Sequence, residues 1–124
     1  MRWWYLVVAM AAAGPTASVA DIYVCPEGGD YPDIASAIAA ASDGEVIELC
    51  CDYDFTGPNN RELDYGGKRI TIRSACGDPD RCVIDCEGQG RGFRFHGGET
   101  SESILEGVTI RDGYVTDYGG AISC

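Results

Sequence analysis

Apolar side chains recur near the start of the chain at the spacing of an α-helix. Four of them fall at positions i, i+3, i+4 and i+7 and therefore share one helical face: Ile34, Ala37, Ile38 and Ala41. Asp30 precedes this stretch and can cap its first turn, whereas Gly44 follows it and can adopt the left-handed conformation that ends a helix. The pattern predicts one helix over about residues 31–42.

Beyond Gly44 the chain changes to short apolar runs that are separated by glycine, proline and aspartate. Apolar positions in these runs recur 23 residues apart: Ile47, Ile70 and Phe93 in one set, and Leu49, Ile72 and Phe95 in another. A third set, Val83-Ile84 and Ile104-Leu105, is offset by 21 residues. Self-similarity at such a period indicates a solenoid, in which each turn of the chain stacks on the previous one.

An antiparallel β-sandwich is the competing interpretation, because it also contains many short strands. A sandwich should carry tight hairpin turns such as Asn-Gly, and that dipeptide is absent from the sequence. The 17 glycines suit the sharp corners of a solenoid, and one amphipathic helix can cover its open end. The pattern therefore favours an all-β solenoid with an N-terminal capping helix.

Four segments in this order resemble the N-terminal end of right-handed parallel β-helix proteins of the pectin-lyase-like type: DYPDIASAIAAASDGEVIEL, RELDYGGKRITIRS, CVIDCEGQGRGFRFHGG and SILEGVTIRDGY. The GGAI tetrapeptide at 119–122 also resembles half of the repeat motif of chlamydia-type polymorphic outer-membrane proteins. The first resemblance implies a right-handed parallel β-helix with an N-terminal capping helix and many coils. Residues 21–124 are then expected to be the N-terminal part of such a domain, truncated at the C-terminus.

The first twenty residues are typical of a secretory signal peptide. Arg2 gives a positive start, an apolar run covers 3–13, and Ser18 and Ala20 occupy the small-residue positions before a cleavage site. The run is shorter than the ~20 residues that a spanning helix needs. We expect cleavage after Ala20, a secreted or cell-surface protein, and no membrane span in residues 21–124.

The net charge of −11 narrows the range of partners. An acidic surface repels nucleic-acid backbones and anionic membranes, so neither is expected as a partner. We expect a monomer that binds a polysaccharide or another cell-surface ligand.

Seven cysteines lie in residues 21–124, and export permits disulfides. An odd number leaves at least one thiol without a partner in this chain. Cys76 and Cys82 bracket the turn GDPDR and are predicted to form a disulfide. Zinc is not indicated, because the sequence has no Cys-x-x-Cys pair and a single histidine, His96, which we interpret as a corner residue.

Four arginines alternate with apolar residues, as the solvent side of half-buried strands should: Arg69, Arg73, Arg91 and Arg94. They are the candidate glycan-binding residues and could contact uronic-acid sugars. Phe93 and Phe95 are interpreted as core. The acidic loop at 51–67 could bind calcium but lacks the spacing of an EF-hand loop, so a solvated loop is favoured and no cofactor is predicted.

A lyase or hydrolase would need carboxylates and a basic group. The candidates are Asp85, Asp112 and Asp117, with Arg94 and Arg111 as bases, but Arg111 and Asp112 are neighbours and would face opposite sides of a strand. The leading hypothesis is a non-catalytic role in binding, adhesion or structure. The alternative is a polysaccharide lyase or hydrolase for acidic glycans, with its site downstream of residue 124. A small self-contained disulfide module is the third.

Overall fold

The computed structural model describes residues 20–116 and 119–124. The predicted signal peptide at 1–20 therefore lies outside the described residues except for Ala20, and so does the candidate carboxylate Asp117.

Most described segments are strands of two to four residues, joined by turns. They are β1 (Ile22–Val24), β2 (Val46–Leu49), β3 (Tyr53–Phe55), β4 (Leu63–Asp64), β5 (Thr71–Ser74), β6 (Cys82–Asp85), β7 (Phe93–Arg94), β8 (Ile104–Glu106), β9 (Thr109–Arg111) and β10 (Ile122–Ser123). The helix α1 spans Ile34–Ala40, and two 3₁₀ turns, η2 (Pro58–Asn60) and η3 (Pro79–Arg81), interrupt the loops.

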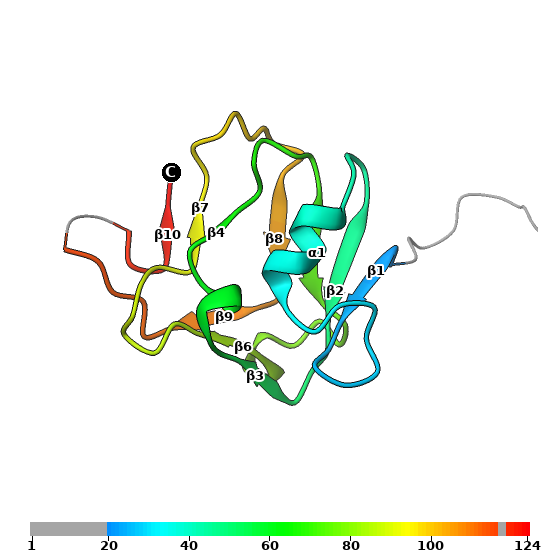
Figure 1. The fold of residues 1–124 in the computed structure, drawn as a ribbon, viewed down its shortest axis with the longest axis horizontal. Coiled ribbons are helices and arrows are strands. Elements are labelled where there is room, and N and C mark those ends of the chain that lie inside the picture. The colour runs from blue at the N-terminus through cyan, green and yellow to red at the C-terminus, as the bar shows by residue number, and fades with distance from the viewer. Residues whose placement is uncertain (1–19, 117–118) are drawn as a thin grey trace, which may run out of the picture.

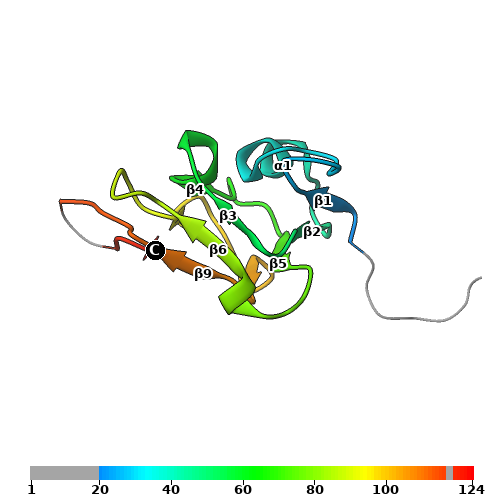
Figure 2. The same ribbon diagram turned by 90° about the horizontal axis from the view of Figure 1, so that it is seen from below.

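The strands form three small parallel sheets, with the orders β1-β2-β5-β8, β3-β6-β9 and β4-β7-β10. Figure 1 shows the three sheets around a common interior, with α1 lying across it. Figure 2 shows that α1 lies on the β1 side of the molecule, whereas β9 lies on the opposite side. From β2 to β10, consecutive strands along the chain therefore belong to different sheets, and neighbours within a sheet are separated by a long stretch of sequence.

The structure corrects the prediction of a right-handed parallel β-helix solenoid. Residues 20–116 and 119–124 show three short parallel sheets and one helix, and no solenoid is evident among them. The stacks expected from the 23-residue period are also absent. Ile47 pairs with Ile72 and not with Ile70, while Phe93 pairs with Leu63 and Ile122 in a different sheet. The period was wrong because it joined apolar residues of different sheets into one column.

Helix α1 is shorter than the predicted range of 31–42. Its N-cap is Asp33, whose side chain accepts a hydrogen bond from the Ser36 amide at 2.8 Å. The predicted cap, Asp30, instead accepts from the amide of Tyr23 in β1. At the other end Ala41 is already extended, so the helix ends before Gly44, whose φ of 90° belongs to the turn that leads into β2.

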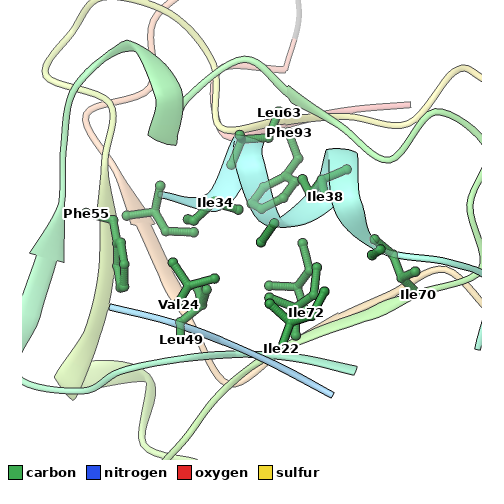
Figure 3. Packing of buried hydrophobic residues seen from close by; sticks show 14 of the residues in the cluster. Ile22, Val24, Ile34, Ile38, Leu49, Phe55, Leu63, Ile70, Ile72 and Phe93 are labelled. Atoms are coloured by element: carbon green, nitrogen blue, oxygen red, sulfur yellow. The ribbon is translucent and has the colours of Figure 1, made fainter. Parts of the chain in front are cut away.

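The apolar interior is built from alternate residues of the strands and from one face of α1. Figure 3 shows Ile22, Val24, Leu49 and Ile72 directed toward Ile34 and Ile38 of the helix. Phe55, Leu63, Ile70 and Phe93 complete this core from the other two sheets and their loops. The alternation of buried and exposed positions in β1, β2 and β5 leaves the opposite side chains on the outer face.

Asn60, at the end of η2, joins this turn to the helix. Its Oδ1 accepts a hydrogen bond from the amide of Ile34 at 2.9 Å, and its Nδ2 donates to the carbonyl of Thr56 at 2.7 Å. The side chain is buried, with 7% of the residue exposed. The amides in the first turn of a helix have no acceptors within the helix. Asn60 supplies an acceptor for one of these amides from another part of the chain.

Replacing Asn60 with alanine is expected to lower the free energy of unfolding by about 1–3 kcal/mol, because it leaves a buried amide and a carbonyl without partners. Asn59 is the matched control, since it is the neighbouring asparagine, is exposed, and donates from Nδ2 to Asp33 at the long distance of 3.4 Å. Urea unfolding of Asn60→Ala and Asn59→Ala measures the difference. Equal midpoints for the two variants would contradict this role of Asn60.

Candidate functional site

The outer face of the sheet β1-β2-β5-β8 carries polar and aromatic side chains in register. Tyr23, Glu48, Arg73 and Glu106 are aligned across its four strands. Because neighbouring strands in a sheet lie about 5 Å apart, these side chains form one continuous row. A second row next to it contains Val46, Thr71 and Ile104.

The centre of the first row is an ion pair. Arg73 donates from Nε at 3.0 Å and from a terminal nitrogen at 2.8 Å to the same oxygen, Oε2, of Glu48. Both side chains are about three-quarters buried, with 24% and 22% exposed. The two charge-assisted contacts fix the guanidinium plane, so Arg73 is held in one orientation.

A second arginine, Arg69, lies just before β5, four residues ahead of Arg73. It is bound to Asp43 through its backbone amide at 2.8 Å and its guanidinium at 3.1 Å, and Glu102 lies 3.7 Å away. The backbone N–H of Arg69 and then its side chain lower the pKa of Asp43 below its ordinary value. Asp43 therefore stays ionised near neutral pH.

Two open grooves lie on this face. One, of about 410 Å³, is lined by Asp43, Gly44, Arg69, Thr71, Ser101, Glu102 and Ile104. The other, of about 480 Å³, is lined by Glu48, Arg73, Ser74, Ala75, Cys76, Gly77, Glu106 and Gly107. Each groove thus contains one arginine and two carboxylates, and it can offer hydrogen-bond donors and acceptors to the same ligand.

The other two predicted glycan-binding residues lie elsewhere. Arg91 and Arg94 are next to and within β7, in a different sheet, and both approach Glu62, at 3.8 and 3.9 Å. The structure therefore brings Arg69 and Arg73 onto one face but does not join all four arginines into a single strip. Glu48, Asp43 and Glu102, which complete the grooves, were not among the residues predicted from the sequence.

A third groove, of about 400 Å³, lies between α1 and β4 and has a more apolar lining. Ala35, Ile38 and Ala39 of the helix face Leu63 and Tyr65 across it. Lys68 at its edge donates from Nζ to the carbonyls of Ile38 at 2.6 Å and Ala39 at 3.2 Å. Lys68 thereby caps the C-terminal end of the helix, which is a structural role.

The residues considered for catalysis do meet, but as an ion-pair cluster. Arg111 lies 2.8 Å from Asp54, 3.2 Å from Asp85 and 3.9 Å from Asp112. The hydrogen bond to Asp85 and the charge of Asp54 raise the pKa of Arg111, and the amide of Glu87, followed by Arg111, lowers that of Asp85. These shifts keep Arg111 protonated and Asp85 ionised, which opposes their use as a general base and a general acid. Arg94, the other candidate base, is in another sheet.

His96 and the acidic loop have ordinary surface partners. His96 Nε2 lies 3.6 Å from Asp64, and both side chains are exposed. In the loop at 51–67, Asp52 is paired with Arg81 and Asp54 with Arg111. In the described part of the chain, no group of three or more His, Cys, Asp or Glu residues is arranged to hold a metal ion.

Two disulfides link consecutive strands of the first sheet at one corner. Cys25 is bonded to Cys50 and Cys51 to Cys76, with Cα separations of 5.4 and 6.3 Å. The predicted pair of Cys76 and Cys82 is therefore wrong. Cys82 is a buried free thiol whose inward position in β6 separates it from the corner, and burial raises its pKa to about 11.

The remaining thiols are Cys86, which is buried, and Cys124, which is exposed. Burial, followed by the charge of Asp85, raises the pKa of Cys86. A raised pKa keeps a thiol protonated and unreactive, so Cys82 and Cys86 behave as apolar core residues.

Within residues 20–116 and 119–124, no helix has the length and apolar character needed to cross a bilayer.

Comparisons with known proteins give this chain no relative. No family model, no curated protein and no solved structure matches it. The resemblance to pectin-lyase-like β-helix proteins and to chlamydia-type repeats is accordingly corrected, since neither the comparisons nor the fold supports it.

Proposed function

We propose that this chain is an extracellular polysaccharide-binding module whose ligand contacts the outer face of the sheet β1-β2-β5-β8. The observation that carries the proposal is the row of Tyr23, Glu48, Arg73 and Glu106, which runs in register across four strands beside two grooves. A rigid sheet holds these side chains at fixed spacing, which reduces the ordering cost of binding a repeating ligand.

The disulfides support the extracellular part of the proposal. Two bonds join Cys25 to Cys50 and Cys51 to Cys76, and such bonds persist in oxidising compartments. They also fix the corner at which β1, β2 and β5 end, directly beside the groove that contains Cys76. The binding face is consequently stabilised at the strand ends where short strands would otherwise fray.

The chemistry of the face supports a sugar ligand. The 38% exposed Tyr23 offers an aromatic surface, and the Arg73–Glu48 pair offers donors and acceptors in a fixed plane. Binding sites combine apolar or aromatic surface with a few well-placed polar groups, and this face has both. A binding role suits the arginines, because each guanidinium is held in place by a carboxylate and presents its donors in a fixed position.

Replacing Arg73 with glutamine is expected to weaken polysaccharide binding at least tenfold, because it removes the charged donor at the centre of the row. Arg81→Gln is the matched control: Arg81 also donates two hydrogen bonds to one carboxylate, that of Asp52, but lies outside this sheet. Affinity electrophoresis in gels with a panel of neutral and acidic polysaccharides, followed by calorimetry, measures both variants. Absence of binding to the whole panel by the unmodified chain, or equal affinity of the two variants, would refute the proposal.

A further inference from the structure

The charge balance of the two grooves restricts the ligand. Their linings contain four carboxylates, those of Asp43, Glu48, Glu102 and Glu106, but only two guanidinium groups, those of Arg69 and Arg73. The excess is 4 − 2 = 2 negative charges on a chain whose net charge is already −11. Such a surface repels an anionic polymer at long range.

The arginines do not reverse this balance locally. Arg73 makes two short contacts to Glu48, and Arg69 contacts Asp43 and approaches Glu102. A uronate carboxylate would have to displace these protein carboxylates and leave them close to a second negative charge. An uncharged sugar avoids that cost, because a hydroxyl group can donate to a carboxylate and accept from the same guanidinium without breaking the pair.

The aromatic and apolar residues of the face suit a sugar ring. Tyr23 is 38% exposed at one end of the first row, and Ile104 is 37% exposed in the second row. Both side chains offer apolar contact area between charged neighbours on the sheet. The ring of Tyr23 is flat, and its hydroxyl group adds a polar end. Pyranose rings have apolar faces and hydroxyl edges, which match this alternation.

The spacing of the grooves sets a minimum ligand length. Arg69 and Arg73 are four residues apart on one segment, which in extended chain corresponds to roughly 13 Å. Thr71 and Ile104 of the second row lie between them and line the first groove. A single sugar contacts one groove, whereas a chain of several sugars contacts both.

We infer that the ligand is an uncharged oligosaccharide segment that spans both grooves, and this inference rests on the proposed function. The carboxylate–arginine pairs bind its hydroxyl groups, and Tyr23 packs against a ring. The acidic excess excludes polyuronates, which the arginines alone had suggested as ligands. Electrostatic attraction contributes little to such binding, so its affinity should depend weakly on salt.

Calorimetry with hexasaccharides of defined composition tests the ligand class. The probes are cellohexaose, laminarihexaose and mannohexaose as neutral chains, hexagalacturonate as the acidic chain, and glucose and mannose as single sugars. We expect at least one neutral hexasaccharide to bind at least tenfold more tightly than hexagalacturonate and than either single sugar. Raising NaCl from 50 to 500 mM should change that affinity less than threefold.

Two tyrosine variants locate the site. Tyr23→Ala should weaken neutral binding about tenfold, whereas Tyr53→Ala, which removes a tyrosine of similar exposure (41%) from β3 in another sheet, should leave it unchanged. Equal effects of the two variants would overturn the assignment of the ring contact. Circular dichroism confirms that both variants are folded before affinities are compared.

The outcomes separate this inference from the proposed function. Preference for hexagalacturonate, with affinity lost in Arg73→Gln, would overturn the neutral-ligand inference and leave the binding face intact. Equal affinity for single sugars and hexasaccharides would overturn the span across both grooves. Failure of all probes and of the wider polysaccharide panel would overturn both proposals.

Discussion

Replacing Phe93 with alanine is expected to lower the free energy of unfolding by about 3–5 kcal/mol, the cost of emptying a large buried site. Phe93 is fully buried in β7 and lies between Leu63 of β4 and Ile122 of β10. Its ring also makes an edge contact with Tyr65 and a stacked contact with Phe95, each with centroids 6.0 Å apart. Urea unfolding followed by circular dichroism gives the change.

Tyr114→Ala is the control for Phe93→Ala, because Tyr114 is an aromatic residue with 59% of its surface exposed. Its replacement should alter the unfolding free energy by less than about 0.5 kcal/mol. If Phe93→Ala were as mild as Tyr114→Ala, Phe93 could not be the centre of the third sheet.

Removing the disulfide between Cys25 and Cys50, by replacing both residues with alanine, is expected to cost about 3–4 kcal/mol. The two cysteines are 25 residues apart, and the bond restricts the unfolded chain over a loop that contains all of α1. Without the crosslink the unfolded chain gains conformational entropy, and the free energy of unfolding falls. Urea unfolding under non-reducing conditions compares the double variant with the unmodified chain.

Cys124→Ala serves as the control for this pair, because Cys124 is exposed and has no disulfide. Its replacement should leave the unfolding midpoint unchanged. Adding a reductant should lower the stability of the unmodified chain at least as far as that of the double variant, since it also opens Cys51–Cys76. Insensitivity to both treatments would show that these bonds do not form.

The single helix could be predicted from the sequence, whereas the fold class could not. The 3.6-residue pattern of Ile34, Ala37 and Ile38 correctly indicated a helix with its apolar face inward, because that pattern depends only on local geometry. Its ends were misplaced by about three residues at the start and two at the end. Capping by Asp33 and Asn60 depends on contacts that local spacing does not reveal.

The register was predicted incorrectly, although a signal for it was present. Cys25 and Cys50 are 25 residues apart, and so are Cys51 and Cys76. The same spacing separates the paired residues Ile47 and Ile72. Cysteine spacing is a better guide to the strand register than apolar spacing here. The many apolar residues can be aligned with several different periods, whereas the few cysteines fit fewer periods.

The candidate site was found only in part. Arg69 and Arg73 were recognised because they alternate with apolar residues in one strand region. Their carboxylate partners Glu48 and Asp43 come from the preceding strand and its turn, 25 and 26 residues earlier, and only the correct register reveals them. Asp54, which lies 57 residues from Arg111, has no comparable signal in the sequence.

Disulfide mapping tests most directly whether β1, β2 and β5 lie side by side in a 25-residue register and present one outer face. The chain is digested without reduction at low pH, which prevents thiol exchange, and the linked peptides are identified by mass spectrometry. We expect peptides that link Cys25 to Cys50 and Cys51 to Cys76, with Cys82 and Cys86 as free thiols. A peptide that links Cys76 to Cys82, or Cys25 to Cys76, would contradict that register and, with it, the outer face of the sheet β1-β2-β5-β8.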